Sequence, residues 1–339
     1  MTTSRQHAHR RSQVRIGAFL AVAALLAAAC SSAEEAVSNK AAEPGRAPEV
    51  STKVAGESVR VGDLPQGIVY DATSDLLAVA VRNPFRILLL DPTTLRVETS
   101  VPMPGKVRHL QLAKPGGPVL VPVESANQII EVSLPSGEAR VTDVERQPHD
   151  AAAIANGDLV VGNEFSGSIS VVREGVVRKT FDDLLQPGGV VTDDNTAVVI
   201  DVKDYSVTTY DLDDMVRVDR VQAGAGPTHG VMLNDGRLAV TDTRGGDVLI
   251  YDIDPLKEVG RIALGDRPYG ITVDTRTNLV WVTLITKNEL VGLDLTEDIP
   301  KVVARYATER QADTVAVDPG SKTLWVTGTA EGLVQRIER

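Results

Sequence analysis

Short apolar runs separated by turn residues recur along the chain, and the stretch Ala225–Ile253 shows the pattern clearly. Three runs in it, Gly230–Leu233, Leu238–Thr241 and Val248–Ile253, are apolar and rich in β-branched residues, which favour strands. Asn234–Gly236 joins the first two runs, and its Asn, Asp and Gly are typical of tight turns. The stretch therefore predicts three short β-strands joined by turns.

A fourth run follows at Val259–Leu264, and the whole pattern then starts again at a fixed period. Each unit opens at a residue that is usually proline: the openers are Pro65, Val107, Pro148, Pro187, Pro227, Pro268 and Ala312. They are 39 to 44 residues apart, close to the roughly 40–45 residues of a propeller blade. Units of four short strands bury both faces of every sheet only when they pack radially. The sequence therefore predicts an all-β fold, a seven-bladed β-propeller of four-stranded blades.

The two ends of this repeat complement each other. The last unit, Asp313–Arg339, holds only three apolar runs, whereas an additional run, Glu57–Gly62, precedes the first unit. We expect this N-terminal strand to supply the missing outer strand of the seventh blade and so to close the ring, which removes exposed sheet edges. The predicted propeller domain spans residues 56–339.

The second run of each unit carries a resemblance to a known family. Leu238–Asp242 (LAVTD), Val280–Leu284 (VWVTL) and Leu324–Gly328 (LWVTG) resemble the YVTN-type β-propeller repeat, which is related to NHL and quinoprotein-like propellers. The resemblance implies that the first strand of each blade lines a central channel. It also implies that the loops entering this strand form one face together with the loops between second and third strands.

On that geometry, residues beside the blade openers surround the channel mouth. The candidate ligand-binding residues are Arg108, His109, His149, Asp150, His229, Tyr269 and Asp313. Imidazoles near carboxylates could hold a transition metal, so His149, His229 and His109 are also metal candidates. A polar ligand pocket without metal and a purely structural role are the alternatives. We expect a solvent-filled mouth, with room for a ligand left by glycines such as Gly67 and Gly270.

Signatures of enzymes are mostly missing from the chain. There is no G-x-S-x-G nucleophile motif, and an acylated Cys30 would leave no free thiol. The pattern therefore favours a monomeric binding module for a small polar ligand or an exported protein. The alternative is a metal-dependent propeller enzyme, hydrolase- or lactonase-like, or a quinoprotein-like oxidoreductase. No cofactor is assigned, and a metal ion at the channel mouth is the one that the residues could support.

The N-terminal region predicts export and lipidation. Basic residues precede an apolar segment, Ile16–Ala29, that is too short for a comfortable membrane span. It ends in Leu26-Ala27-Ala28-Ala29-Cys30, which resembles a bacterial lipobox. We therefore expect a lipoprotein signal peptide over residues 1–29, a lipid anchor on Cys30 and a flexible tether over 30–55. The predicted location is the extracytoplasmic face of the cell membrane, reached by the general secretory or the twin-arginine route.

The charge balance excludes one class of partner. The chain has 35 basic and 46 acidic residues, a net charge of −11. Removing the signal peptide removes four arginines and leaves 31 basic against 46 acidic residues, a net charge of −15. Because nucleic-acid binding needs clustered Lys and Arg to replace counterions, we expect no nucleic-acid partner.

Overall fold

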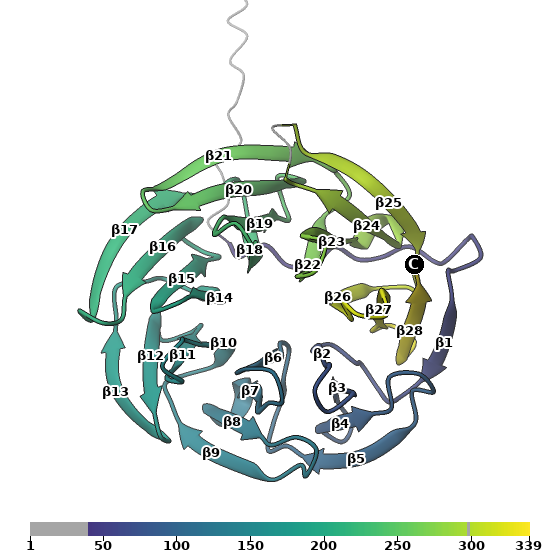
Figure 1. Cartoon of the computed structure of the whole chain (residues 1–339), viewed down its shortest axis with the longest axis horizontal. Coiled ribbons are helices and arrows are strands. Elements are labelled where there is room, and N and C mark those ends of the chain that lie inside the picture. The colour runs from purple at the N-terminus through teal and green to yellow at the C-terminus, as the bar shows by residue number, and fades with distance from the viewer. Residues whose placement is uncertain (1–39, 297–298) are drawn as a thin grey trace, which may run out of the picture. The chain divides into compact units, whose positions relative to one another are not determined.

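Seven antiparallel sheets of four strands each stand radially around a central channel in the computed structural model of the chain (Figure 1). The structure describes residues 40–296 and 299–339, so the predicted signal peptide and Cys30 lie outside the described residues. Within those two ranges, no helix has the length and apolar character needed to span a bilayer. The predicted all-β, seven-bladed propeller is confirmed.

The sheets follow one another in chain order, and in all but the seventh sheet the strands are hydrogen-bonded in sequence order. The first three sheets contain β2 (Ile68–Asp71), β3 (Leu76–Val81), β4 (Arg86–Leu90), β5 (Val97–Pro102), β6 (Gln111–Leu112), β7 (Val119–Val123), β8 (Gln128–Val132), β9 (Ala139–Asp143), β10 (Pro148–Ala153), β11 (Leu159–Asn163), β12 (Ser168–Arg173) and β13 (Val176–Phe181). The next three contain β14 (Pro187–Asp193), β15 (Thr196–Asp201), β16 (Ser206–Asp211), β17 (Val216–Gln222), β18 (Pro227–Met232), β19 (Leu238–Asp242), β20 (Asp247–Ile253), β21 (Leu256–Ala263), β22 (Pro268–Asp274), β23 (Leu279–Leu284), β24 (Glu289–Asp294) and β25 (Lys301–Ala307). The seventh contains β26 (Ala312–Val317), β27 (Thr323–Gly328), β28 (Leu333–Glu338) and β1 (Glu57–Arg60). Two short 3-10 helices, η1 (Glu124–Ala126) and η2 (Ile285–Lys287), follow β7 and β23.

The N-terminal strand closes the ring, as the sequence predicts. β1 pairs antiparallel with β28, with Glu57 opposite Arg336 and Arg60 opposite Leu333. The strand ends two residues earlier than the predicted run Glu57–Gly62. The seventh sheet is therefore built from both ends of the described chain, and no blade is left with three strands (Figure 1).

The core lies between neighbouring sheets. Strands such as β3, β7 and β27 are buried along their whole length, because sheets cover both of their faces. Each of the seven interfaces has its own hydrophobic cluster, from the one between β2–β5 and β6–β9 to the one between β26–β28 and β2–β5. Continuous β-branched runs are what a strand buried on both faces requires. This explains why the second run of each unit reads LAVTD or VWVTL.

An aspartate ends the second strands β15 and β19 and fixes the loops at one end of the ring. The carboxylate of Asp242 accepts hydrogen bonds from the N–H groups of Ala225 at 2.8 Å and Gly245 at 3.0 Å. Asp201 likewise accepts from Leu185 at 2.6 Å and Lys203 at 3.0 Å. One carboxylate thus ties the loop entering an inner strand to the loop after the second strand. We call the surface made by these two sets of loops the loop face.

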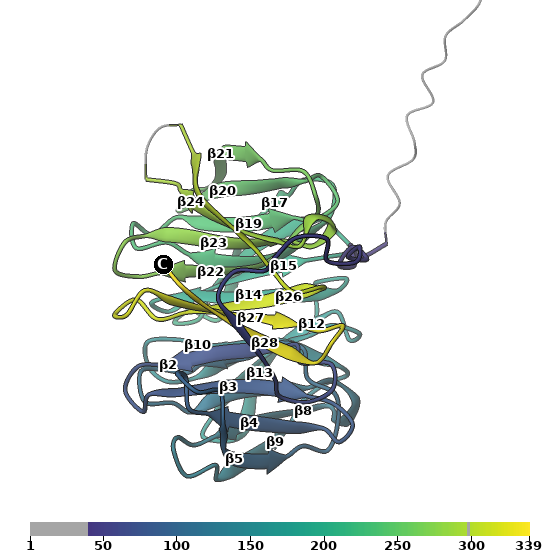
Figure 2. The same ribbon diagram turned by 90° about the vertical axis from the view of Figure 1, so that its right-hand side faces the viewer.

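Residues 40–50, called the strap below, run across the loop face. Figure 2 shows this segment on one side of the ring and the C-terminus on the other. The sequence places the strap in a flexible tether, yet Ala42 and Ala47 are buried against the propeller. This part of the expected tether is therefore bound to the fold.

Candidate ligand site

The residues that follow the blade openers form two rings around the channel. The first residue after each opener lies toward the loop face: Gln66, Arg108, His149, Gly188, Thr228, Tyr269 and Asp313. The second residue lies one layer deeper: Gly67, His109, Asp150, Gly189, His229, Gly270 and Thr314. Six of the seven pairs belong to or directly precede an inner strand, and Arg108 and His109 precede the short strand β6. The repeat therefore brings residues about one blade apart in sequence to one place.

Three imidazoles stack across the channel. The ring centre of His109 lies 4.6 Å from that of His149 and 4.5 Å from that of His229. The Nε2 atoms of His109 and His229 are 3.2 Å apart. The Tyr269 ring meets His229 edge-on at 4.5 Å. The structure thus brings together the three histidines that the sequence singles out.

Hydrogen bonds to carbonyl groups fix the protons of this stack. His229 Nδ1 lies 3.2 Å from the carbonyl oxygen of Tyr269, which can only accept, so this nitrogen carries the proton. In the neutral ring, Nε2 of His229 is then an acceptor, and His109 donates to it. Burial lowers the pKa of His229 to about 3, and it lowers the pKa of His109 well below 6.5. Both rings are neutral at neutral pH.

Asp150 lies beneath the imidazoles in a network of hydrogen bonds. Its carboxylate accepts from the N–H of Val190 at 3.0 Å and from the Gln111 amide at 3.0 Å. The same Gln111 amide donates to the carbonyl of Val190 at 2.9 Å. Burial raises the pKa of Asp150 to about 6, although these hydrogen bonds and His149 act against it. Asp150 is therefore a buried carboxyl group that exchanges its proton near neutral pH.

Charged side chains surround His149 on the loop side. Glu124, which is 3% exposed, pairs with Lys106 Nζ at 2.6 Å and with Arg108 Nε at 3.2 Å. His149 Nε2 lies 4.0 Å from the same carboxylate, and its Nδ1 donates to the carbonyl of Gly188 at 2.7 Å. A buried carboxylate needs such partners, so Glu124 organises this part of the mouth.

The strap covers this polar mouth. Beneath Ala41, Ala42 and Glu43, a space of only about 20 Å³ remains, and Arg108, His149, His229 and Tyr269 are among the residues that line it. The expected solvent-filled mouth is thus closed in this structure. Phe165 is 51% exposed, whereas Tyr205 is buried and helps to hold the strap.

The glycines at the channel do not leave room for a ligand, contrary to expectation. A Cβ on Gly270 would lie 2.5 Å from the carbonyl oxygen of Asp313 in the next blade. On Gly67 it would lie 2.8 Å from Leu110 and 3.2 Å from the carbonyl oxygen of Arg108. The missing side chains let neighbouring inner strands approach each other, so these glycines serve the packing of the ring.

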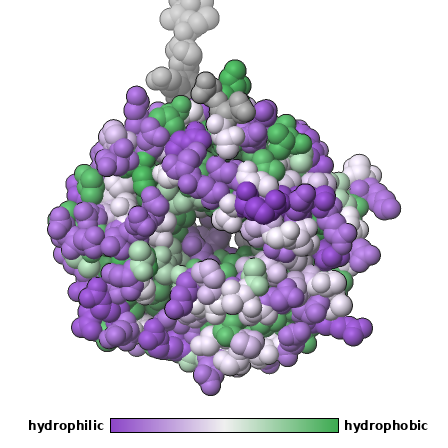
Figure 3. Space-filling view, viewed as in Figure 1, coloured by the Kyte–Doolittle hydropathy of each residue, from purple (hydrophilic) through white to green (hydrophobic). Residues whose placement is uncertain are grey.

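The larger space lies on the other side of the imidazoles. A cavity of about 580 Å³ fills the channel and reaches the loops between first and second strands, including Thr73, Lys114, Thr275 and Pro319. Figure 3, which views the ring as in Figure 1, shows the surface hollowed at its centre. His229 lines both this cavity and the small space under the strap. The imidazole stack therefore separates the two.

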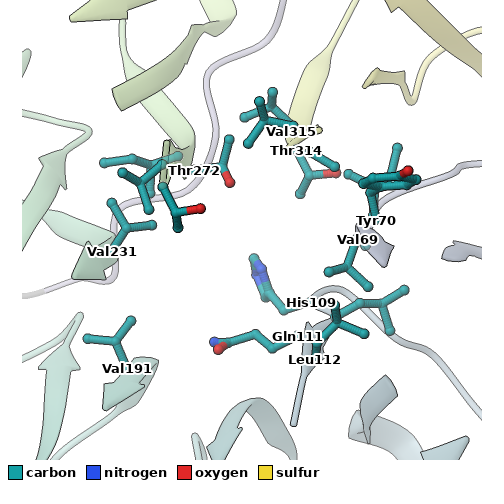
Figure 4. A pocket seen from close by; sticks show the side chains of 18 of the residues that line it. Val69, Tyr70, His109, Gln111, Leu112, Val191, Val231, Thr272, Thr314 and Val315 are labelled. Carbon is teal, nitrogen blue, oxygen red and sulfur yellow. The ribbon is translucent and has the colours of Figure 1, made fainter. Parts of the chain in front are cut away.

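The walls of the cavity are mostly apolar, and its inner end is polar. Figure 4 shows side chains of the inner strands pointing into it; the labelled apolar ones are Val69, Leu112, Val191, Val231 and Val315. Thr272, Thr314 and Tyr70 add hydroxyl groups. His109, Gln111, Asp150 and His229 lie at the inner end. The cavity thus offers an apolar body with one hydrogen-bonding end.

The predicted site residues are divided among these spaces. His109 and Asp150 line only the cavity, whereas Arg108, His149 and Tyr269 line only the space under the strap. Asp313 accepts from Gln66 Nε2 at 3.3 Å and Gln311 Nε2 at 2.9 Å, and burial raises its pKa. Gln111 and Gln311 are not predicted from the sequence, because they lie near blade openers but glutamine by itself indicates no particular chemistry.

A metal site is not formed by these residues in the described structure. Within residues 40–296 and 299–339, no three His, Cys, Asp or Glu side chains form a group that could hold a metal ion. His109 and His229 face each other through nitrogen atoms, with a proton between them. The arrangement suits hydrogen bonding to a ligand better than coordination of a metal.

Comparison with known proteins supports the fold. No protein-family model matches the chain, and no curated protein sequence matches it. Among solved structures, it is similar to hydrazine synthase of Kuenenia stuttgartiensis, with a TM-score of 0.71, 16% identity, and coverage of 86% of this chain and 98% of that chain. It is also similar to virginiamycin B lyase of Staphylococcus aureus, with a TM-score of 0.72, 15% identity and coverage of 85% and 100%. A chain of a mitotic checkpoint complex gives a TM-score of 0.73 at 12% identity, with coverage of 88% and 98%. Similarity at this level of identity shows the propeller fold alone.

Proposed function

We propose that this chain is a membrane-anchored, extracytoplasmic binding module of the YVTN/NHL type whose ligand site is the central cavity. The cavity of about 580 Å³ carries this proposal. Small-molecule sites are typically concave, mostly apolar and about 300–1,000 Å³ in volume, with a few converging polar groups. The cavity has these properties, whereas the mouth on the loop face is covered by the strap.

The lining specifies the chemistry of the ligand. Valine, leucine and threonine side chains would contact an apolar body, and the Asp150 carboxylate at the inner end would accept hydrogen bonds from it. Gln111 and the His109–His229 pair hold the polar groups in place. The expected ligand is a small molecule with an apolar body and one hydrogen-bond donor group, such as a hydroxyl or an amine.

A cavity-filling variant tests the site. Val231 lines the cavity, so Val231→Trp should fill part of it, whereas Val218 is 64% exposed on the outer strand β17 and Val218→Trp is the matched control. Small apolar alcohols and amines would be screened by thermal shift. Compounds that raise the melting temperature of the wild type and of Val218→Trp, but not of Val231→Trp, support the proposal. A screen in which every stabilising compound acts equally on Val231→Trp refutes it.

The lipid anchor is the second part of the proposal. Its support is the apolar segment Ile16–Ala29 followed by Cys30 in a lipobox-like sequence. Two acyl chains give stable membrane binding, whereas one gives marginal binding. Cys30→Ser should therefore shift the protein from the membrane fraction to the soluble fraction. A Cys30→Ser variant that still sediments with membranes excludes the lipid anchor.

Catalysis at the same inner end is the second candidate. Asp150 has a pKa of about 6, and neutral imidazoles adjoin it, so the group could transfer protons near neutral pH. One of the similar structures is a lyase, virginiamycin B lyase. Elemental analysis of untagged protein tests the metal-dependent form of this candidate. A stoichiometric metal ion would favour the metal-dependent enzyme over the binding module.

A further inference from the structure

The strap is held mainly through its backbone. The Gln311 amide accepts a hydrogen bond from Ala47 N–H at 3.0 Å and donates to the carbonyl of Gly45 at 3.0 Å. Asn288 Nδ2 donates to the carbonyl of Pro48 at 3.0 Å. One side-chain amide thus pairs with the strap as a neighbouring strand would pair with an extended peptide.

The end of the strap nearest residue 40 is recognised in the same way. Tyr205 Oη donates to the carbonyl of Lys40 at 2.8 Å, and Arg244 Nη2 donates to the same oxygen at 2.6 Å. Because carbonyl and N–H groups are common to all residues, these contacts suit any extended peptide that follows the same path.

Charge and side-chain size restrict which peptide fits. Arg108 Nη1 lies 3.7 Å from the Glu43 carboxylate, and Arg310 pairs with Glu49. Ala42 faces Gly226, on which a Cβ would lie only 2.8 Å from the Ala42 methyl group. Ala47 packs on Tyr269 and Ile285. The surface therefore takes an extended peptide with a carboxylate at two positions and small residues at two others.

The strap is weakly anchored by comparison with the rest of the fold. Its buried side chains are alanines, which bury little apolar area, and its two ion pairs involve glutamates that are 68% and 87% exposed. Exposed ion pairs contribute at most about 1 kcal/mol each. Segments with few buried apolar contacts open locally far more often than the core does.

We propose that the surface beneath the strap is a binding site for an extended peptide of an exported protein, with carboxylates at two positions, which displaces the strap. Arg108 and Arg310, which pair with Glu43 and Glu49, provide charge complementarity at these two positions in a chain whose net charge is −11. Displacement also uncovers the polar mouth of Arg108, His149 and Tyr269. The partner peptide would carry carboxylates at the positions of Glu43 and Glu49.

A synthetic peptide of residues 40–50 is the probe for this site. In the full mature chain, Ala42→Arg combined with Ala47→Arg should detach the strap, because neither position has room for a long side chain. The fluorescently labelled peptide should bind this opened variant at least about tenfold more tightly than the wild type, in which the tethered strap competes at an effective concentration in about the millimolar range.

Matched substitutions in the opened variant identify the contact. Gln311→Ala should weaken peptide binding about tenfold through the loss of two hydrogen bonds, whereas Gln128→Ala, which lies in the outward region of another blade, should leave it unchanged. A peptide with Lys in place of Glu43 and Glu49 should bind more weakly. No binding to an opened variant that melts normally, or equal binding with and without Gln311, overturns the proposal. A wild-type dimer that the peptide dissociates also overturns it, because the occupant is then a second copy.

Discussion

His109 and His229 are 120 residues apart in sequence, yet their Nε2 atoms lie 3.2 Å from each other inside the channel. The carbonyl of Tyr269 fixes the proton of His229 on Nδ1, so one proton, donated by His109, occupies the contact between the two rings. Protonating His229 would place a second proton in that contact. The pair therefore behaves as a neutral hydrogen-bonded unit.

The first prediction concerns stability against pH. The pKa of His229 is about 3 when folded and 6.5 ordinarily, so the unfolded chain binds more protons between these values. The free energy of unfolding should then fall as pH drops below 6.5, by up to about 1.4 kcal/mol per pH unit from this group. The buried His109 adds to the loss. Asp150, with a pKa raised to about 6, opposes it between 3.8 and 6.

Replacing the imidazole isolates this contribution. Between about pH 7 and pH 5, the free energy of unfolding of His229→Gln should fall by about 1–2 kcal/mol less than that of the wild type. Urea unfolding at several pH values measures the free energy of unfolding of both proteins. Parallel stability curves for wild type and variant would show that His229 does not resist protonation in the folded state.

The second prediction concerns closure of the ring. Val61 N–H donates to the carbonyl of Gly332 in the loop before β28. In an antiparallel pair, every second residue of a strand points its N–H toward the partner strand. Val59, two residues earlier and opposite Val334, therefore also points its N–H toward β28. Val59→Pro should therefore destabilise the protein by about 1–3 kcal/mol through the loss of this ladder hydrogen bond. Thr52→Pro, in the exposed stretch before β1, is the control and should have little effect. Equal melting temperatures for the two variants would contradict closure by β1.

The third prediction concerns the glycines of the inner strands. A methyl group on Gly270 would meet the backbone of Asp313 and Thr314 at 2.5 and 3.0 Å. Gly270→Ala should therefore cost about 1–3 kcal/mol through overpacking. Gly260 lies on the outer strand β21, where an added Cβ meets only Ile250 at 3.6 Å. Gly260→Ala should be tolerated in the same thermal unfolding assay, and an equal loss in both variants would count against the close approach.

The fourth prediction concerns proteolysis of the strap. Trypsin can cleave after Arg46 and after Lys53, which are both exposed, but Ala47 is buried and its N–H is bonded to Gln311. Because cleavage requires local opening, the Arg46 site should be cut more slowly than the Lys53 site. Gln311→Ala should accelerate cleavage after Arg46 and leave cleavage after Lys53 unchanged. Mass spectrometry of the early fragments distinguishes the two sites, and an unchanged rate at Arg46 would show that Gln311 does not hold the strap.

The sequence predicts the architecture well because the same pattern of apolar runs and turns is repeated along the chain. Every second run is apolar and β-branched, and every opener is followed by an inner strand, so errors in one unit are corrected by the others. The closing strand is predicted by the same logic, since the last unit lacks one strand. The meeting of His109, His149 and His229 also follows from their shared place in the repeat.

The features that the sequence does not predict depend on contacts outside the repeat. The strap has the Ala, Glu and Pro composition of a linker, and its contacts use backbone groups that leave no trace in composition. Gln311 binds the strap because of where its amide lies, and a glutamine in the sequence does not by itself indicate such a contact. The role of Gly270 depends on the backbone of the next blade, which no local pattern reveals. The volume of the channel likewise depends on how seven blades pack together.

While the strap is bound, the position of Lys40 limits the length of chain between the proposed lipid anchor and the propeller. The predicted tether would reach to residue 55, but the contacts of Tyr205 and Arg244 with Lys40 hold the chain on the loop face from that residue onward. With the proposed lipid on Cys30, only ten residue steps separate the anchor from the propeller, a reach of at most about 35 Å. Under this proposal the loop face would lie on the bilayer side, and the entrance of the cavity would be turned to the surrounding medium, from which a diffusing ligand would arrive.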